Sequence, residues 1–159
     1  MLLRHGAAAA KAAAGDRERA LTSEGRRAVQ ALAGRLRSRG IQPDLVLCSP
    51  ARRTRETLEL LEAAWATRPE AIIEEPLYLA DAASLLLRLR AAEPEAAGAL
   101  LVGHNPGLEE LARTLAGPGN QSLRAGLPTA GLVVFDISAP WSGLAPASAR
   151  LVEVLVPEL

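Results

Sequence analysis

The chain contains two histidines, and each follows a short apolar run that ends in a loop. His5 comes after Leu2 and Leu3, and His104 comes after the run 99–103, which ends at a glycine. Such runs are typical of buried parallel strands, and in open α/β sheets ligands bind at the carboxyl ends of these strands. We therefore expect the two imidazole rings to meet over one site.

A third strand-end cluster lies between the two histidines. The apolar run 45–48 is followed by turn residues and then by the pair Arg52 and Arg53, and a further arginine, Arg4, precedes His5. Arginine presents a planar fork of donors that matches phosphate oxygens, and a neutral imidazole is a competent nucleophile toward phosphorus. The three clusters together predict a pocket for a phosphoryl group.

The order of these motifs resembles the histidine phosphatase superfamily, the phosphoglycerate mutase-like proteins. Arg4-His5-Gly6 is similar to the RHG signature of that family. The resemblance spans nearly the whole chain and is strongest to the small SixA-type phosphohistidine phosphatases. It is carried further by Asp16-x-x-Arg19-x-Leu21-Thr22-x-x-Gly25, Ser49-Pro50-x-x-Arg53-Thr54-x-x-Thr57, Val102-Gly103-His104-Asn105-Pro106 and Pro128-Thr129-Ala130-Gly131.

The resemblance implies a role for each residue of the predicted pocket. His5 would attack phosphorus in line and form a phosphohistidine enzyme intermediate, which water then hydrolyses. Arg4 and Arg53 would hold the phosphoryl oxygens and neutralise charge in the transition state, and His104 would donate a hydrogen bond to one of them. The family pattern, and not the spacing, selects Arg53 rather than Arg52.

Several neighbouring residues have weaker claims on the substrate. On a helix that starts near Pro50, Arg52 and Arg55 point away from Arg53, either into solvent or toward a substrate. Ser49 is a candidate for phosphate contact and equally a turn and helix-cap residue. The remaining candidates are the Asn105 backbone N–H at a helix start, and Lys11, where many relatives carry a polar phosphate contact; Cys48 is expected to be a buried hydrophobic residue.

A proton donor for an ester leaving group is hard to identify. Relatives that cleave phosphate esters supply a carboxylic acid from the segment after the third strand, here 74–81, and the candidates there are Asp81 and Glu75. A phosphoramidate needs such an acid less, because an imidazole leaving group can be protonated before cleavage. The connections are also too short for a large lid, which favours a phosphorylated side chain on another protein. Asp16 and Arg19 either shape the mouth of this site or are ordinary loop residues.

The elements that must position these residues alternate between strand-like and helix-like segments. This rhythm predicts one α/β domain over 1–159, with three layers: a mostly parallel central sheet and helices on both faces, as in the phosphoglycerate mutase-like fold. The connection 7–20 has no clear assignment, and 118–128 is expected to be a loop near the site. We expect strands at 1–5, 44–48, 71–74, 99–103, 132–137 and 151–156, the last two as an antiparallel edge, and helices at 22–39, 50–65, 82–92 and 106–116.

Composition excludes several classes of protein. Lys and Arg together number 18, as do Asp and Glu, so no overall field favours nucleic acid or an anionic membrane. The single cysteine cannot form an internal disulfide, and no apolar stretch reaches the ~20 residues of a membrane span. Met1 leads directly into a strand without the features of a signal peptide, so we expect a cytoplasmic protein.

Three functions remain open at this point. The first is a phosphohistidine phosphatase that acts on a histidine phosphotransfer protein. The second is a phosphomonoesterase for a small phosphorylated metabolite, with Asp81 or Glu75 as the acid. The third is a phosphate-binding regulatory module without catalysis. We expect no cofactor and no metal, because two distant histidines without a His-x-x-x-His pair or a carboxylate cluster form no recognisable metal site.

Overall fold

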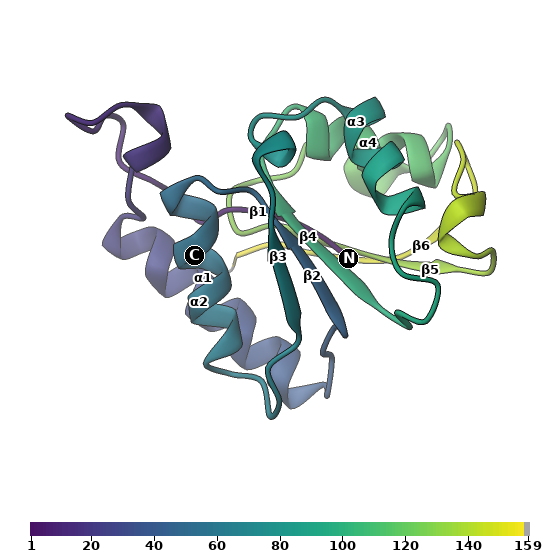
Figure 1. The fold of residues 1–159 in the computed structure, drawn as a ribbon, viewed down its shortest axis with the longest axis horizontal. Coiled ribbons are helices and arrows are strands. Elements are labelled where there is room, and N and C mark those ends of the chain that lie inside the picture. The colour runs from purple at the N-terminus through teal and green to yellow at the C-terminus, as the bar shows by residue number, and fades with distance from the viewer. Residues whose placement is uncertain (158–159) are drawn as a thin grey trace.

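The computed structural model describes residues 1–157 and is built around a mixed six-stranded sheet with the order β3-β2-β4-β1-β5-β6 (Figure 1). Strands β3, β2, β4 and β1 run parallel, whereas β5 is antiparallel to β1 and β6 is antiparallel to β5. The predicted antiparallel edge of the last two strands is therefore confirmed. The strands are β1 (Leu2–Arg4), β2 (Leu45–Cys48), β3 (Glu70–Ile73), β4 (Ala99–Gly103), β5 (Leu132–Ile137) and β6 (Ala149–Leu155).

Helices cover both faces of the sheet, which confirms the predicted α/β architecture. Helices α1 and α2 lie on one face, and α3 and α4 lie on the other (Figure 1). Successive strand residues point to opposite faces, so that Leu47 packs under α3 and α4, while Val46 packs under α1 and α2. The helices are α1 (Ser23–Ser38), α2 (Arg52–Glu62), α3 (Ala82–Arg90) and α4 (Gly107–Ala116), with short 3₁₀ helices η1 (Asp16–Glu18), η2 (Glu75–Leu77), η3 (Gln121–Leu123) and η4 (Trp141–Gly143).

Helix α1 follows the sequence pattern closely. The Thr22 hydroxyl accepts a hydrogen bond from the Gly25 N–H at 3.0 Å, which caps the first turn. Val29, Leu32 and Leu36 repeat at helical spacing and are all buried against the sheet.

Among residues 1–157, none of the helices combines the length and the hydropathy that a membrane span requires.

Helix α2 differs from its prediction at both ends. Pro50 does not open the helix, because Ala51 at the N-cap still has an extended backbone, with φ −58° and ψ 146°, and the helix begins at Arg52. Residues 49–51 form a turn instead, in which the Thr54 hydroxyl donates to the Ser49 carbonyl at 2.7 Å. The helix ends at Glu62, so Trp65 lies beyond it. Trp65 is half-buried against the hydrophobic cluster between the sheet and helices α1 and α2.

The parallel strands deliver the predicted residues to one edge of the sheet. Arg4 in β1 is the register partner of Gly103 in β4, so His5 and His104 leave adjacent strands at the same level. Cys48 in β2 is the partner of Val102, which places Ser49 beside the same edge. Parallel register therefore brings three strand ends together.

The connection between His5 and α1 contains little regular structure. It consists of an isolated bridge between Ala8 and Leu21 and the 3₁₀ helix η1. The Ala9 N–H donates to the Ala20 carbonyl at 2.9 Å, so the segment returns on itself before α1 begins. In Figure 1 it is the purple loop that projects beside α1 and α2.

Candidate active site

The two histidine rings meet at the carboxyl edge of the sheet. The ring centroids of His5 and His104 are 5.3 Å apart, with an angle of 58° between the ring planes. Both side chains are largely buried, and His5 retains 8% of its accessible surface. The predicted meeting of the two imidazoles over one site is thus present in the structure.

The His5 ring is held in one tautomer by the backbone. Its Nδ1 lies 2.7 Å from the Gly6 carbonyl oxygen, and because a carbonyl only accepts, Nδ1 carries the proton. Nε2 consequently keeps its lone pair. Burial lowers the pKa of His5 to about 4, with the charges of Arg53 and Arg4 acting in the same direction. At neutral pH, His5 is an uncharged imidazole with an unprotonated Nε2.

His104 lies between a hydroxyl and a guanidinium group. Its Nε2 is 2.6 Å from the Ser49 hydroxyl oxygen, and its Nδ1 is 3.3 Å from the Arg53 Nη2. Because a guanidinium only donates, Nδ1 accepts, and Nε2 donates its proton to Ser49. Burial, and then the charge of Arg53, lower the pKa of His104 to about 3. This second ring is also neutral.

Two arginines bring positive charge to the rings. Arg53 is 1% exposed, and its Nη1 donates to the Asp16 carbonyl at 2.8 Å. The Nη1 of Arg4 donates to the Leu127 carbonyl at 2.8 Å. In both arginines the Nε–H is buried and has no partner within the described chain. Buried donors without acceptors are rare, so this arrangement is suited to an anion with several oxygens.

Buried polar side chains connect the loops that carry these groups. The Thr57 hydroxyl accepts from the Gly6 N–H at 3.1 Å and donates to the Arg53 carbonyl at 2.7 Å, which joins α2 to the loop after His5. On the other side, Glu109 in α4 accepts from the Leu127 N–H at 2.8 Å. Leu127, which Glu109 holds in this way, is the residue whose carbonyl group accepts from Arg4.

The weaker substrate-contact candidates occupy different positions. Ser49 touches the site only through His104, and its hydroxyl oxygen also lies 3.5 Å from the Ala51 N–H, as a turn residue would. The Asn105 side chain donates to Glu109 and to the Leu127 carbonyl, so it fixes the loop around Arg4. Lys11 is exposed in the connection before η1.

Both proton-donor candidates are committed to other contacts. Asp81 caps α3 by accepting from the Ser84 N–H at 2.8 Å, and this bond holds the pKa of its carboxyl below the usual value. Glu75 forms a salt bridge of 2.7 Å with Arg17, which lowers its pKa as well. At neutral pH each carboxyl group is therefore protonated less often than an ordinary exposed carboxyl group, and it is a poorer proton donor for that reason.

Two further residues of the site were underestimated or missed in the sequence. Asp16 accepts from the Arg53 Nη2 at 3.1 Å and from the Tyr78 hydroxyl group. The Tyr78 ring lies edge-on to His104, with centroids 5.6 Å apart. Two features of the sequence could have pointed to these residues. Asp16 belongs to one of the motifs that resemble the family, and Tyr78 is the one tyrosine of the chain.

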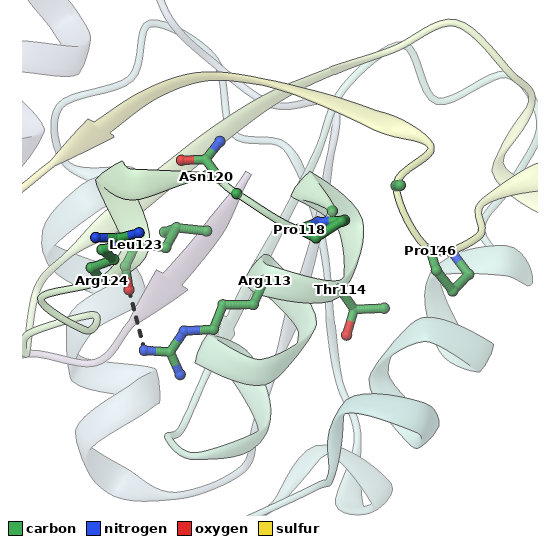
Figure 2. A pocket seen from close by; sticks show the side chains of 10 residues that line it. Arg113, Thr114, Pro118, Asn120, Leu123, Arg124 and Pro146 are labelled. Atoms are coloured by element: carbon green, nitrogen blue, oxygen red, sulfur yellow. Dashed lines mark hydrogen bonds between the residues drawn. The ribbon is translucent and has the colours of Figure 1, made fainter.

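A separate pocket lies at the far end of α4. It has a volume of about 500 Å³, and Figure 2 shows Arg113 donating to the Leu123 carbonyl at its wall. His5, His104, Arg4 and Arg53 do not line it. Among residues 1–157, no group of three or more His, Cys, Asp and Glu side chains is arranged to hold a metal ion.

The chain belongs to the histidine phosphatase superfamily. The model of branch 1 of that family matches residues 1–77, the half that contains Arg4, His5 and Arg53. The resemblance noted in the sequence is thereby confirmed at the level of the family. Membership and the structural relatives described next support a phosphatase.

The similar proteins extend over nearly the full chain. An uncharacterized protein of Mycobacterium leprae is 32% identical over 147 residues, which is 89% of each chain. A structure from Agrobacterium tumefaciens, provisionally assigned as the phosphohistidine phosphatase SixA, has a TM-score of 0.85 at 31% identity and covers 98% of this chain and 96% of its own. The protein histidine phosphatase SixA complexed with tungstate has a TM-score of 0.82 at 25% identity, with coverages of 98% and 95%.

Proposed function

We propose that the protein removes phosphate from phosphohistidine on another protein, with His5 as the nucleophile. The observation that carries this proposal is the state of His5: its Nδ1 is fixed on the Gly6 carbonyl, and its Nε2 keeps a free lone pair beside buried arginine donors. A neutral ring nitrogen in this state can attack phosphorus.

The reaction proceeds in two displacements. The Nε2 lone pair of His5 forms a bond to phosphorus while the bond from phosphorus to the substrate imidazole breaks, and the imidazole leaves with the proton that it already carries. Water then attacks the phosphohistidine of the enzyme, releases inorganic phosphate and restores the His5 lone pair. The free Nε–H groups of Arg4 and Arg53 bind the phosphoryl oxygens as charge spreads over them.

His104 binds the phosphoryl group through a change of tautomer. When an oxygen approaches Nδ1, the ring can carry its proton there, because the Ser49 hydroxyl is able either to accept from Nε2 or to donate to it. Ser49 is thus a positioning residue for the second histidine. The bound tungstate of the SixA relative, an oxyanion with the charge and oxygens of phosphate, supports this kind of ligand.

The leaving group is inferred from the carboxyl groups of the site. An alkoxide needs a proton as it departs, whereas the pKa values of Asp81 and Glu75 are both shifted downward by their partners. An imidazole leaving group arrives already protonated. The relatives assigned as phosphohistidine phosphatases point in the same direction.

The test compares two substrates. The protein is incubated with a phosphohistidine peptide and with p-nitrophenyl phosphate, and the released phosphate is measured. We expect the higher kcat/KM on the phosphohistidine peptide, and we expect His5→Ala to abolish both turnover and phosphoenzyme labelling. Turnover of the ester alone would instead identify a phosphomonoesterase, and inertness of folded protein toward both would identify a binding module.

A matched pair of arginines serves as the control. Arg53→Lys keeps the charge but loses the planar fork, and we expect it to lower kcat by about 10²-fold. Arg55 lies two residues away in α2, is exposed and donates to the Pro50 carbonyl, so Arg55→Lys is expected to change kcat less than about twofold. Equal losses in the two variants would argue against the assigned role of Arg53.

A further inference from the structure

A half-exposed carboxylate stands next to the predicted phosphoryl site. Asp16 lies in η1, and its side chain is 47% exposed, although its Oδ2 contacts the fully buried Arg53 and the Tyr78 hydroxyl. Its Oδ1 forms an ion pair with the Arg19 Nε at 2.9 Å. A carboxylate offers about four acceptor positions, so Oδ1 keeps capacity for another donor on the solvent side.

Asp16 is anionic whenever the enzyme is folded at neutral pH. The hydrogen bond from Tyr78, and then the hydrogen bond and the charge of Arg53, lower the pKa of its carboxyl to about 2. It therefore has no proton to give. It holds the same guanidinium group that the proposed function places on the phosphoryl oxygens, and Tyr78 packs edge-on against His104. The negative charge of Asp16 is thus fixed beside the proposed phosphoryl site.

We infer that Asp16 determines specificity for a phosphorylated imidazole, because the remaining acceptor capacity of its Oδ1 takes the N–H of the leaving ring and keeps that ring protonated. This assignment rests on the proposed function and deepens it. It explains how the site dispenses with a carboxylic acid, since an anion that stabilises an imidazolium replaces an acid that protonates an oxygen.

The proton balance favours a phosphoramidate over an ester. In phosphohistidine the proton sits on the ring nitrogen that is not bonded to phosphorus, and the electron pair of the breaking P–N bond returns to the other nitrogen. Neutral imidazole leaves, and Asp16 remains a carboxylate. An alkoxide would leave with a negative charge near the Asp16 carboxylate, which raises its energy.

The groups around Asp16 do not titrate in the working range. It faces Arg53 from α2, Arg19 from its own segment, Tyr78 from the segment after η2 and His104 from the end of β4, while Arg17 lies over the Tyr78 ring. Arginines stay charged, the pKa of Tyr78 is raised by its bond to Asp16, and the pKa of His104 is far below neutrality. Between pH 6 and 9, the substrate imidazolium is left as the titrating group.

The experiment measures kcat on a saturating phosphohistidine peptide between pH 6 and 9, since kcat reports the pKa values of the enzyme–substrate complex. Activity falls as pH rises through the pKa of the bound imidazolium. Asp16→Asn removes the charge, so we expect this falling limb to move about one pH unit lower, which is about a tenfold extra loss at the upper end. Tyr78→Phe removes a contact to Asp16 but leaves the negative charge of Asp16 in place. We therefore expect the falling limb of this variant to stay at the same pH as in the wild type.

The outcomes separate the inference from the proposed function. The ratio of phosphohistidine to p-nitrophenyl phosphate turnover should fall in Asp16→Asn and in a second variant, Asp16→Ser, both checked for folding by circular dichroism. Equal fractional losses at every pH and on both substrates would make Asp16 a support for Arg53 alone and overturn the inference. A wild-type protein that leaves phosphohistidine intact would overturn the proposed function, and with it the inference.

Discussion

At the scale of single residues, the site depends on two imidazoles that are kept uncharged by burial. Both rings lie among guanidinium groups, so protonating either one would place a further positive charge in a desolvated space. Under the proposed function His5 needs its lone pair for attack, and its neutral state is secured well below pH 7. In that proposal the arginines supply the positive charge for the phosphoryl group without competing for the proton.

Nuclear magnetic resonance can check this directly, because the chain has only two histidines. We expect the Cε1–H shifts of His5 and His104 to stay constant from pH 8 to pH 5.5, since their pKa values are lowered to about 4 and about 3. Resonances that titrate near pH 6.5 in folded protein would contradict the buried neutral pair. His5→Asn assigns the two signals.

Acid stability follows from the same shifts. In the unfolded chain both histidines titrate near 6.5, so below that pH the unfolded state binds protons that the native state refuses. The free energy of unfolding therefore falls as the pH drops from about 6.5 through about 4. Urea unfolding at pH 7 and pH 5 measures this loss, and His5→Asn should reduce it.

At the scale of elements, the first turn of α1 supports the loop that follows His5. Gly25 packs directly on the backbone of Ala7, and a Cβ at position 25 would lie 2.1 Å from the Ala7 carbonyl oxygen. That carbonyl already accepts from the Thr22 N–H at 2.9 Å. The glycine is thus required for the close approach of the helix to the loop that follows His5.

Two glycines of the same helix allow a matched comparison. We expect Gly25→Ala to lower the free energy of unfolding by about 2 kcal/mol or more and to reduce turnover, because the Ala7 backbone must move. Gly34 has nothing within 4 Å of its ideal Cβ position, so Gly34→Ala should instead stabilise the protein by about 0.5–1 kcal/mol. Urea titration measures both, and equal effects in the two variants would speak against the packing of α1 on Ala7.

At the scale of the whole molecule, the sheet separates two hydrophobic clusters, one under each pair of helices. Cys48 lies in β2, an interior strand of the sheet, within one of these clusters and is fully buried. Burial raises the pKa of its thiol to about 12, so it carries little thiolate at neutral pH. Any reagent that modifies this thiol needs the core to open.

The single thiol should therefore report opening of the core. With Ellman's reagent at pH 8 we expect negligible reaction in native protein, and reaction of one thiol per chain within seconds in 6 M guanidinium chloride. Raising urea below the unfolding midpoint should increase the rate in step with the population of unfolded protein. Rapid modification of the native state would contradict the burial of β2.

The sequence alone determined the alternation of elements and the strand ends that carry chemistry. Apolar runs and their stopping points are local signals, so the edges of β1, β2 and β4 could be read from them. Because parallel strands share one carboxyl edge, their order also predicted that His5 and His104 would meet. Most strand and helix boundaries agree within two residues, and the largest deviation, at the end of α2, falls where no local stop signal stands.

Only the tertiary structure decided what surrounds the pair of rings. Asp16 and Tyr78 are 62 residues apart, and neither lies in a segment whose periodicity fixes its position. Their contact, and the one between Asp16 and Arg53, depend on how an irregular connection folds over α2 and the segment after β3. Long-range contacts of loops leave no repeating pattern in a sequence, whereas the inferred role of Asp16 depends on them.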